Sequence, residues 1–257
     1  QPRSRGLGDV YKRQGQPYTF SIIGTTLSSA THVDVKNEVE RLTAFAAVEG
    51  VERLWSKHIA AWDKLWESDI VIEGDLQSQQ DIHSMLYHMY AFVREGSGLS
   101  CSPMGFSGFG YNGHVFWDAD TWIFPALLLL HPELAESMIE YRYQRLDAAR
   151  HNAFMHGYKG AMYPWESSEM GNEDNTVTNM YGPFENHITG DVAMAAWQYY
   201  AVTQDVEWLR QKGFSILSAA AEYWVSRSES NEAGEYEIRN VIGADEWLSL
   251  IHISEPT

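Results

Sequence analysis

Three short segments of the sequence place tryptophan beside carboxylates: FWDAD at 116–120, PWES at 164–167 and ADEW at 244–247. Neighbouring carboxylates can divide the work of a general acid and a general base when their environments differ. Tryptophan normally seeks the core and carboxylates avoid it, so each segment needs a reason to hold both. Taken singly, each is also explained by a tryptophan that closes a loop and an acid that caps the next helix. Asp120, just before TWIFPALLLL, fits such a cap as well as it fits a ligand-binding role.

The recurrence of this pattern in three loops favours one shared site for a sugar. Cleavage of a glycosidic bond with inversion needs a carboxyl that protonates the leaving oxygen. It also needs a carboxylate that activates water on the opposite face, about 6.5–9.5 Å away. Tryptophan offers a flat surface for the apolar face of a pyranose, and the aromatic content of 13%, with ten Trp and fourteen Tyr, agrees with such a site.

Other motifs in the chain are weaker. GFGYNG at 108–113 matches G-x-G-x-x-G, but SCSPM precedes it and HVFWD follows, so the strand and helix of a dinucleotide site are missing. GFSGF misses the G-x-S-x-G elbow by one residue. The pairs His83/His88 and His151/His156 are five residues apart, whereas ligands that share a helix face are four apart. We therefore expect no metal and no organic cofactor.

The charge of the chain limits its partners. A formal net charge of −17 argues against nucleic acid and anionic membrane as partners. No apolar run approaches the roughly 20 residues of a membrane span. Cys101 is the single cysteine, which excludes an intramolecular disulfide.

Most of the chain has helical periodicity. From Val48, VERLWSKHIAAWDKLWES places its large apolar residues at three- and four-residue spacings, which predicts an amphipathic helix. Strands are predicted over 18–27, where YTFSIIGTTL is rich in β-branched and aromatic residues, and over 69–74. Further helices are predicted over 76–95, 121–130, 132–155, 188–203 and 205–228. Helical hairpins with long loops between them indicate a mainly α fold of the α/α toroid type.

The two ends of the chain do not continue the patterns beside them. QPRSRGLGDVYKRQ at 1–14 and LSLIHISEPT at 248–257 resemble translated sequencing-adapter DNA rather than protein termini. We therefore expect these two ends to be artefacts and interpret residues 15–247 as the protein segment.

Four long stretches, GYNGHVFWDADTWIFPALLLLHPELA, EYRYQRLDAARHNAFMHGYKGAMYPWES, ENHITGDVAMAAWQYYAVTQD and VIGADEW, resemble glycoside hydrolase family 65 in this order. That family has an N-terminal β-sandwich, a helical linker, an (α/α)6 barrel and a small C-terminal sheet. The resemblance therefore implies the C-terminal part of the β-sandwich at 15–47 and the helical linker at 48–74. Residues 75–247 would be the first half of the barrel.

The resemblance also assigns roles to individual residues. Glu246 matches the general acid of the family, and Trp117 and Asp118 match the pair that holds the non-reducing glucose. Residues that match the leaving-group subsite are Trp165, Glu166 and Thr189. Residues expected only to lie near the site are Asp120, His187 and Asp245. The family's general base is expected beyond Trp247, so the segment by itself is expected to be inactive and poorly soluble.

The activity implied is that of an inverting α-glucoside hydrolase acting on kojibiose-like or trehalose-like disaccharides, or on glucosyl conjugates. WDADTWIFP favours the hydrolase branch, because phosphorylases of the family mostly carry FWDTEIF at this place. ADEW, in place of the commoner PDEY, resembles a bacterial subgroup similar to kojibiose hydrolases. The alternatives are an inverting phosphorylase, which would use inorganic phosphate, and a non-catalytic sugar-binding helical domain. A hydrolase is expected in the periplasm or secreted, and a phosphorylase in the cytoplasm. The oligomeric state stays open.

Overall fold

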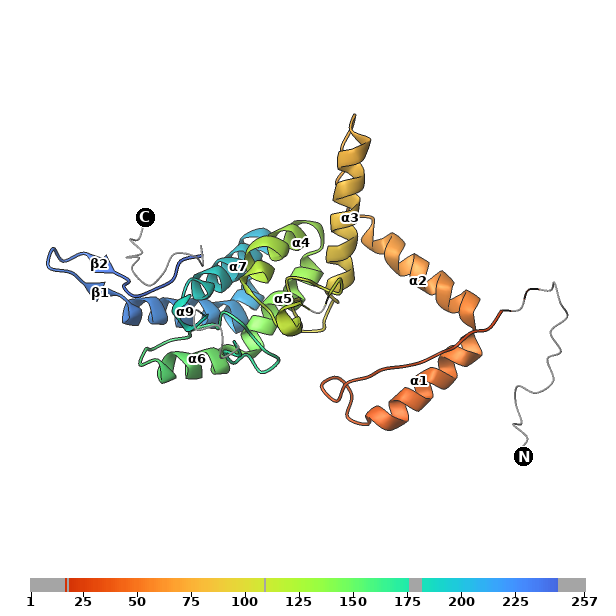
Figure 1. The fold of residues 1–257 in the computed structure, drawn as a ribbon, viewed down its shortest axis with the longest axis horizontal. Helices are drawn as coiled ribbons and strands as arrows, with labels where there is room; N and C mark the ends of the chain where they lie inside the picture. The colour runs from red at the N-terminus through yellow and green to blue at the C-terminus, as the bar shows by residue number, and fades with distance from the viewer. Residues whose placement is uncertain (1–16, 18, 109, 176–181, 245–257) are drawn as a thin grey trace. The chain divides into compact units, whose positions relative to one another are not determined.

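The structure is a computed structural model that describes residue 17 and residues 19–108, 110–175 and 182–244. The chain forms two compact units, the first ending at Glu67 and the second beginning at Ser68. Helices account for most of the described residues in both units (Figure 1). The prediction of a mainly α chain is therefore confirmed.

The described residues of the first unit form two helices, α1 (Val35–Glu49) and α2 (Val51–Leu65). Gly50 separates them with a φ of +80°, a left-handed backbone conformation that glycine adopts without steric cost. Glu49 accepts a hydrogen bond from the Lys57 ammonium at 2.8 Å, which ties the end of α1 to α2. Neither helix contains a buried residue within the described part of the chain.

The strand predicted over 18–27 is not formed in the described residues. Residues 19–28 have no regular secondary structure, and α1 then begins inside the segment assigned to a β-sandwich. A strand is stable only when its backbone groups pair with a neighbouring strand, and no described residue supplies that ladder. The composition of 18–27 indicates a strand, but pairing decides whether one forms. The assignment of 15–47 to a β-sandwich stays a prediction.

The strand predicted over 69–74 is also absent, for a visible reason. The Gln79 amide accepts a hydrogen bond from the Ile72 N–H at 2.6 Å and donates one to the Ile70 carbonyl at 3.0 Å. A side chain of α3 (Leu76–Phe92) thus occupies the backbone groups that a partner strand would use. Asp75 caps α3 by accepting from two N–H groups of its first turn, so the helix begins where the sequence predicts.

The second unit is built mainly from α4 (Phe124–Leu130), α5 (Pro132–Gln144), α6 (Leu146–Met155), α7 (Ile188–Thr203) and α9 (Phe214–Arg227). α4 contacts α5, α5 contacts α7, and α7 contacts α9, so these helices form one continuously packed group. α4, α7 and α9 run beside each other in Figure 1, with α6 along one side. These are the helices expected of an α/α arrangement.

Small residues are buried in these helices. Ala135 of α5, Ala196 of α7 and Ala219 of α9 are almost fully buried, as are larger residues such as Ile216. Gly160 shows what a small residue allows in a loop: a Cβ there would lie 2.2 Å from the Ala219 carbonyl oxygen. This loop can therefore lie directly on α9 only because residue 160 is glycine.

Several predicted helices differ in detail from those observed. The helix predicted over 132–155 is broken at Arg145, whose guanidinium donates to the Glu169 carbonyl at 2.7 Å. The helices predicted over 121–130 and 205–228 both contain a π-helical turn. Tertiary contacts such as that of Arg145 are invisible to helical periodicity. The remaining short elements are η1 (Gly110–Gly113), η2 (Ala119–Ile123), η3 (Gly182–Phe184), α8 (Val206–Trp208), η4 (Leu209–Gly213), β1 (Glu229–Ser230) and β2 (Tyr236–Glu237).

Candidate active site

Two of the three tryptophan–carboxylate segments meet through a short backbone bridge. Val115 and Ser167 exchange two backbone hydrogen bonds, with N···O distances of 3.0 Å and 2.9 Å. Tyr141 of α5 holds this bridge, since its hydroxyl lies 2.8 Å from that of Ser167. The rings of Phe116 and Trp165 meet edge to face with centroids 5.0 Å apart. The structure therefore brings FWDAD and PWES together, as a shared site requires.

Trp117 and Asp118 lie directly before the π-helical turn η2, which begins at Ala119. The Trp117 ring contacts the His187 ring edge to face at 5.0 Å and the Trp122 ring at 5.9 Å, so its plane is held from two sides. Asp118 is half-buried and caps no backbone N–H. Its carboxylate has no hydrogen-bond partner among the residues that the structure describes. Asp118 is therefore a carboxylate open to a ligand.

Asp120 has a different environment from Asp118. It lies in the first turn of η2, and it is buried. Its two oxygens accept hydrogen bonds from Arg142 Nε at 3.1 Å and Nη2 at 2.5 Å. Burial by itself would lower the pKa of Arg142, but the Asp120 carboxylate raises it, so the guanidinium stays charged. Asp120 caps no helix, and its oxygens are occupied by Arg142 rather than open to a ligand.

Glu166 is buried beside the bridge between the two segments. Its Oε1 lies 2.8 Å from His114 Nδ1 and 3.4 Å from Asn112 Nδ2. Its Oε2 accepts no hydrogen bond from the described residues and is not among the fully enclosed oxygens. One oxygen of this carboxylate is thus fixed by protein, and the other is available.

Glu173 supports the same segment and was not singled out in the sequence. Its carboxylate accepts hydrogen bonds from the backbone N–H groups of Trp165 at 2.8 Å and Glu166 at 3.0 Å. Burial raises the pKa of Glu173 to about 7, although these two hydrogen bonds lower it, and the nearby Glu166 raises it further. The sequence around Glu173 does not reveal this role, because only the fold brings its carboxylate to the backbone of PWES.

Thr189 connects α7 to the PWES segment. Its side chain is fully buried, and its hydroxyl accepts a hydrogen bond from the Tyr163 backbone N–H at 3.0 Å. Thr189 therefore fixes the backbone just before PWES through a buried hydrogen bond.

His187 lies between two acids at the start of α7. Its Nδ1 is 2.8 Å from Asp191 Oδ2, and its Nε2 faces Glu185 Oε2 at 3.5 Å, an ion-pair rather than a hydrogen-bond distance. Burial lowers the pKa of this imidazole, but Asp191 and Glu185 outweigh it and raise the pKa to about 9. The ring against Trp117 is therefore an imidazolium at neutral pH.

We expect the charge of His187 to be visible in the pH dependence of stability. A group whose folded pKa is raised from 6.5 to about 9 stabilises the fold fully below about pH 6.5 and loses that contribution as the pH rises through 9. Relative to His187→Asn, which keeps a donor toward Asp191 but does not titrate, the parent should lose up to about 3 kcal/mol of unfolding free energy over this window. Urea titrations across that range test this, with His151→Asn on the exposed face of α6 as the control. If the unfolding free energies of the parent and His187→Asn changed with pH in parallel, the raised pKa of His187 would be contradicted.

The segment that leads to ADEW is anchored beside the same loops. The Ile242 N–H donates to the Phe184 carbonyl at 3.0 Å, and Val241 and Ile242 are buried. Arg227 of α9 joins this segment to the loop before α7, since its guanidinium donates to the Asn186 side chain at 3.0 Å and to the Arg239 carbonyl. The predicted residues Asp245 and Glu246 lie outside the described residues.

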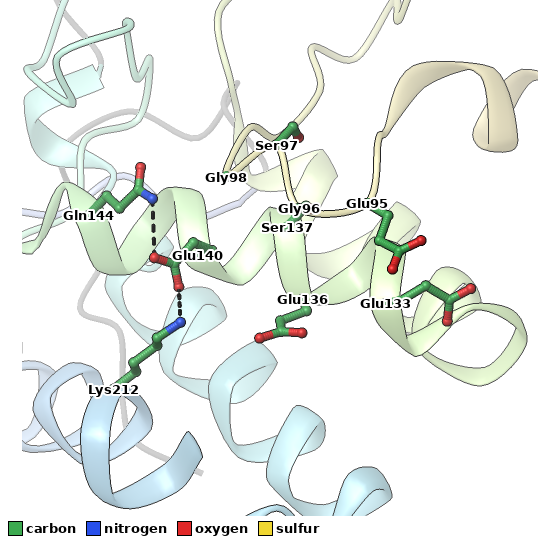
Figure 2. Close-up of a pocket in the computed structure, with 10 residues that line it drawn as sticks. All are labelled: Glu95, Gly96, Ser97, Gly98, Glu133, Glu136, Ser137, Glu140, Gln144 and Lys212. Carbon is green, nitrogen blue, oxygen red and sulfur yellow. Dashed lines mark hydrogen bonds and ion pairs between the residues drawn. The ribbon is translucent and has the colours of Figure 1, made fainter. Parts of the chain in front are cut away.

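A separate cavity of about 350 Å³ lies between the turn at 95–98, α5 and η4 (Figure 2). Glu133, Glu136 and Glu140 line it from α5, and Glu140 is paired with Lys212 at 2.7 Å. It shares no residue with FWDAD, PWES or the start of α7. It is therefore an acidic surface hollow distinct from the candidate site.

The donor groups of the described chain form no metal site: no three His, Cys, Asp or Glu side chains there gather closely enough to hold an ion. Across the same ranges, every helix is too short or too polar to traverse a lipid bilayer.

Known proteins align with most of this chain. The kojibiose hydrolase of Flavobacterium johnsoniae is 60% identical over 239 residues, which are 93% of this chain and 35% of that protein. The kojibiose hydrolase of Mucilaginibacter mallensis is 58% identical over 92% of this chain and 35% of its own length. The kojibiose phosphorylase of Thermoanaerobacter brockii is 40% identical over 83% of this chain and 29% of its own length. The chain thus spans about a third of the length of these curated relatives.

The fold has a counterpart among solved structures. A protein from the human microbiome matches with a TM-score of 0.77 at 22% identity, over 84% of this chain and 32% of that one. The helical hairpins of the second unit are consistent with part of an (α/α)6 barrel, as predicted. Residues 83–254 match the family described as the glycosyl hydrolase family 65 central catalytic domain. Because this match covers more than half of the chain, the chain belongs to glycosyl hydrolase family 65.

Proposed function

We propose that the full-length product of this gene is an inverting α-glucoside hydrolase that acts on α-linked glucosyl disaccharides or glucosyl conjugates of the kojibiose or trehalose kind. The observation that carries the proposal is the joining of FWDAD to PWES, which places the free carboxylate of Asp118 and the half-fixed carboxylate of Glu166 on adjacent segments. The greater identity to kojibiose hydrolases than to phosphorylases supports hydrolysis.

In this mechanism the residues of the chain divide between binding and proton transfer. Trp117 and Asp118 hold the glucose ring, by stacking and by accepting hydrogen bonds from its hydroxyls. Trp165 and Glu166 face the leaving group, while Thr189 keeps their loop in place. Glu246 donates a proton to the glycosidic oxygen as the bond from C1 breaks. For this it must stay protonated near neutral pH, which requires a raised pKa.

The second half of the reaction needs a carboxylate on the opposite face of the ring. That general base takes a proton from water as the water oxygen bonds to C1, so the product is β-glucose. We place this base in another part of the full-length protein. Asp120 and His187 act indirectly in this scheme, because Asp120 is bound to Arg142 and His187 orients Trp117.

The proposal is tested by assaying the full-length protein on α-linked glucosyl disaccharides with and without inorganic phosphate. We expect glucose release that does not depend on phosphate, and polarimetry that shows β-glucose as the first product. Release of a glucosyl phosphate only when phosphate is present would show a phosphorylase, the alternative that the similarity to kojibiose phosphorylases favours. Disaccharide binding without turnover would show a non-catalytic sugar-binding protein.

A further inference from the structure

The GYNG turn, η1, has an unusual backbone. Tyr111 and Asn112 adopt left-handed conformations in succession, with φ of 57° and 54°, and Gly113 follows with a φ of 74°. Glycine accepts this region freely, whereas other residues adopt it at an energetic cost, which is smaller for Asn than for Tyr. Such a conformation persists only where surrounding contacts hold it, and strain of this kind clusters at functional sites. The sequence motif that failed as a dinucleotide fingerprint is therefore a strained turn beside the candidate site.

This turn directs two donors at one oxygen atom. Asn112 Nδ2 and His114 Nδ1 both lie within hydrogen-bond distance of Glu166 Oε1, at 3.4 Å and 2.8 Å. The His114 N–H closes the turn by donating to the Tyr111 carbonyl at 2.8 Å. From the opposite side, Glu173 holds the backbone N–H of Glu166 at 3.0 Å. The position of the Glu166 carboxylate is thus set from both ends of the residue.

We propose that Asn112 and His114 are positioning residues for Glu166, which bind its Oε1 so that its Oε2 receives a hydroxyl of the leaving-group sugar. A free glutamate side chain would lose rotamer freedom each time it bound substrate, and prior fixation removes this cost. Occupying one oxygen also limits which ligand hydroxyls the carboxylate can accept. The turn therefore helps to determine which leaving group the site accepts. This role rests on the proposed function, in which Glu166 faces the leaving group.

The test compares two substrates with the same glucosyl group and different leaving groups, of which only one offers hydroxyls to Glu166. One is an α-glucosyl disaccharide, and the other is an aryl α-glucoside whose leaving group carries no sugar hydroxyl. In the full-length protein, we expect His114→Ala to lower kcat/KM for the disaccharide by about tenfold or more, mainly through KM. The aryl glucoside should change by less than about threefold. His114→Asn, which keeps a donor at the δ position, should restore most of the lost activity.

A second variant separates the hydrogen bond from the strained backbone. Asn112→Gly removes the donor but relieves the left-handed strain, so it should fold at least as stably as the parent while weakening disaccharide turnover selectively. Gln204→Gly is the matched control, because Gln204 has a φ of 55° at the end of α7, outside the candidate site. It should leave the ratio of the two substrates' kcat/KM values unchanged.

The outcomes distinguish this inference from the proposed function. Equal losses on both substrates, or failure of His114→Asn to restore activity, would overturn the positioning role. If the parent cleaves neither substrate, the proposed function fails, and calorimetric binding of the disaccharide then decides the inference. In that case a Kd weakened by about tenfold in His114→Ala supports it, and an unchanged Kd overturns it.

Discussion

Replacing Glu246 with Gln in the full-length protein is expected to lower kcat for disaccharide cleavage by about two to four orders of magnitude. The amide has almost the same shape as the carboxylic acid but cannot give a proton to the leaving oxygen. Substrate binding should change little, so the loss should fall on kcat rather than KM. Steady-state kinetics on a disaccharide measures the effect.

A substrate with a better leaving group makes this prediction specific for acid catalysis. An α-glucoside of an acidic phenol needs little protonation to depart, so Glu246→Gln should slow its cleavage far less. Glu222→Gln, on the exposed side of α9, is a matched control for the chemical change. A loss below about tenfold on the disaccharide, or an equal loss on both substrates, would mean that another group is the acid.

Arg142→Met is expected to destabilise the protein by about 3–5 kcal/mol. The substitution removes the partner of a buried carboxylate, since both oxygens of Asp120 are bound by this guanidinium and both side chains are almost fully enclosed. An uncompensated charge in the interior costs far more than an intact ion pair contributes. Urea denaturation of the full-length variant, followed by tryptophan fluorescence, should show the loss as an earlier unfolding transition.

The double variant Asp120→Leu with Arg142→Met provides the control. If desolvation of a lone Asp120 charge is the cause, removing both charges should recover most of the stability that Arg142→Met loses. If the double variant is as unstable as the sum of the single ones, lost volume and not charge explains the effect. A cost below about 1 kcal/mol for Arg142→Met would show that the pair is not enclosed as the structure has it.

Local sequence was enough to predict most of the helices of the second unit, although not α1 (Val35–Glu49), which lies in a segment predicted to belong to a β-sandwich. The helix predicted over 188–203 coincides with α7 (Ile188–Thr203), and α3 begins at the predicted residue because Asp75 caps it. Helical periodicity and caps act between residues three or four positions apart, so they can be read along the chain. The strand predicted over 69–74 failed because Gln79 occupies its backbone groups, a contact that no local pattern encodes.

In the candidate site, too, some features follow from the sequence and others only from the tertiary structure. The sequence by itself determined which segments carry tryptophan and carboxylates, and the resemblance of these segments to a family of glycosidases. Only the tertiary structure decided which acids are open to a ligand: Asp118 has no partner among the described residues, whereas Asp120 is held by Arg142, 22 positions away. The two residues are chemically identical and nearly adjacent. Their roles differ because α5 packs against η2 and α4 and brings one guanidinium to one of them.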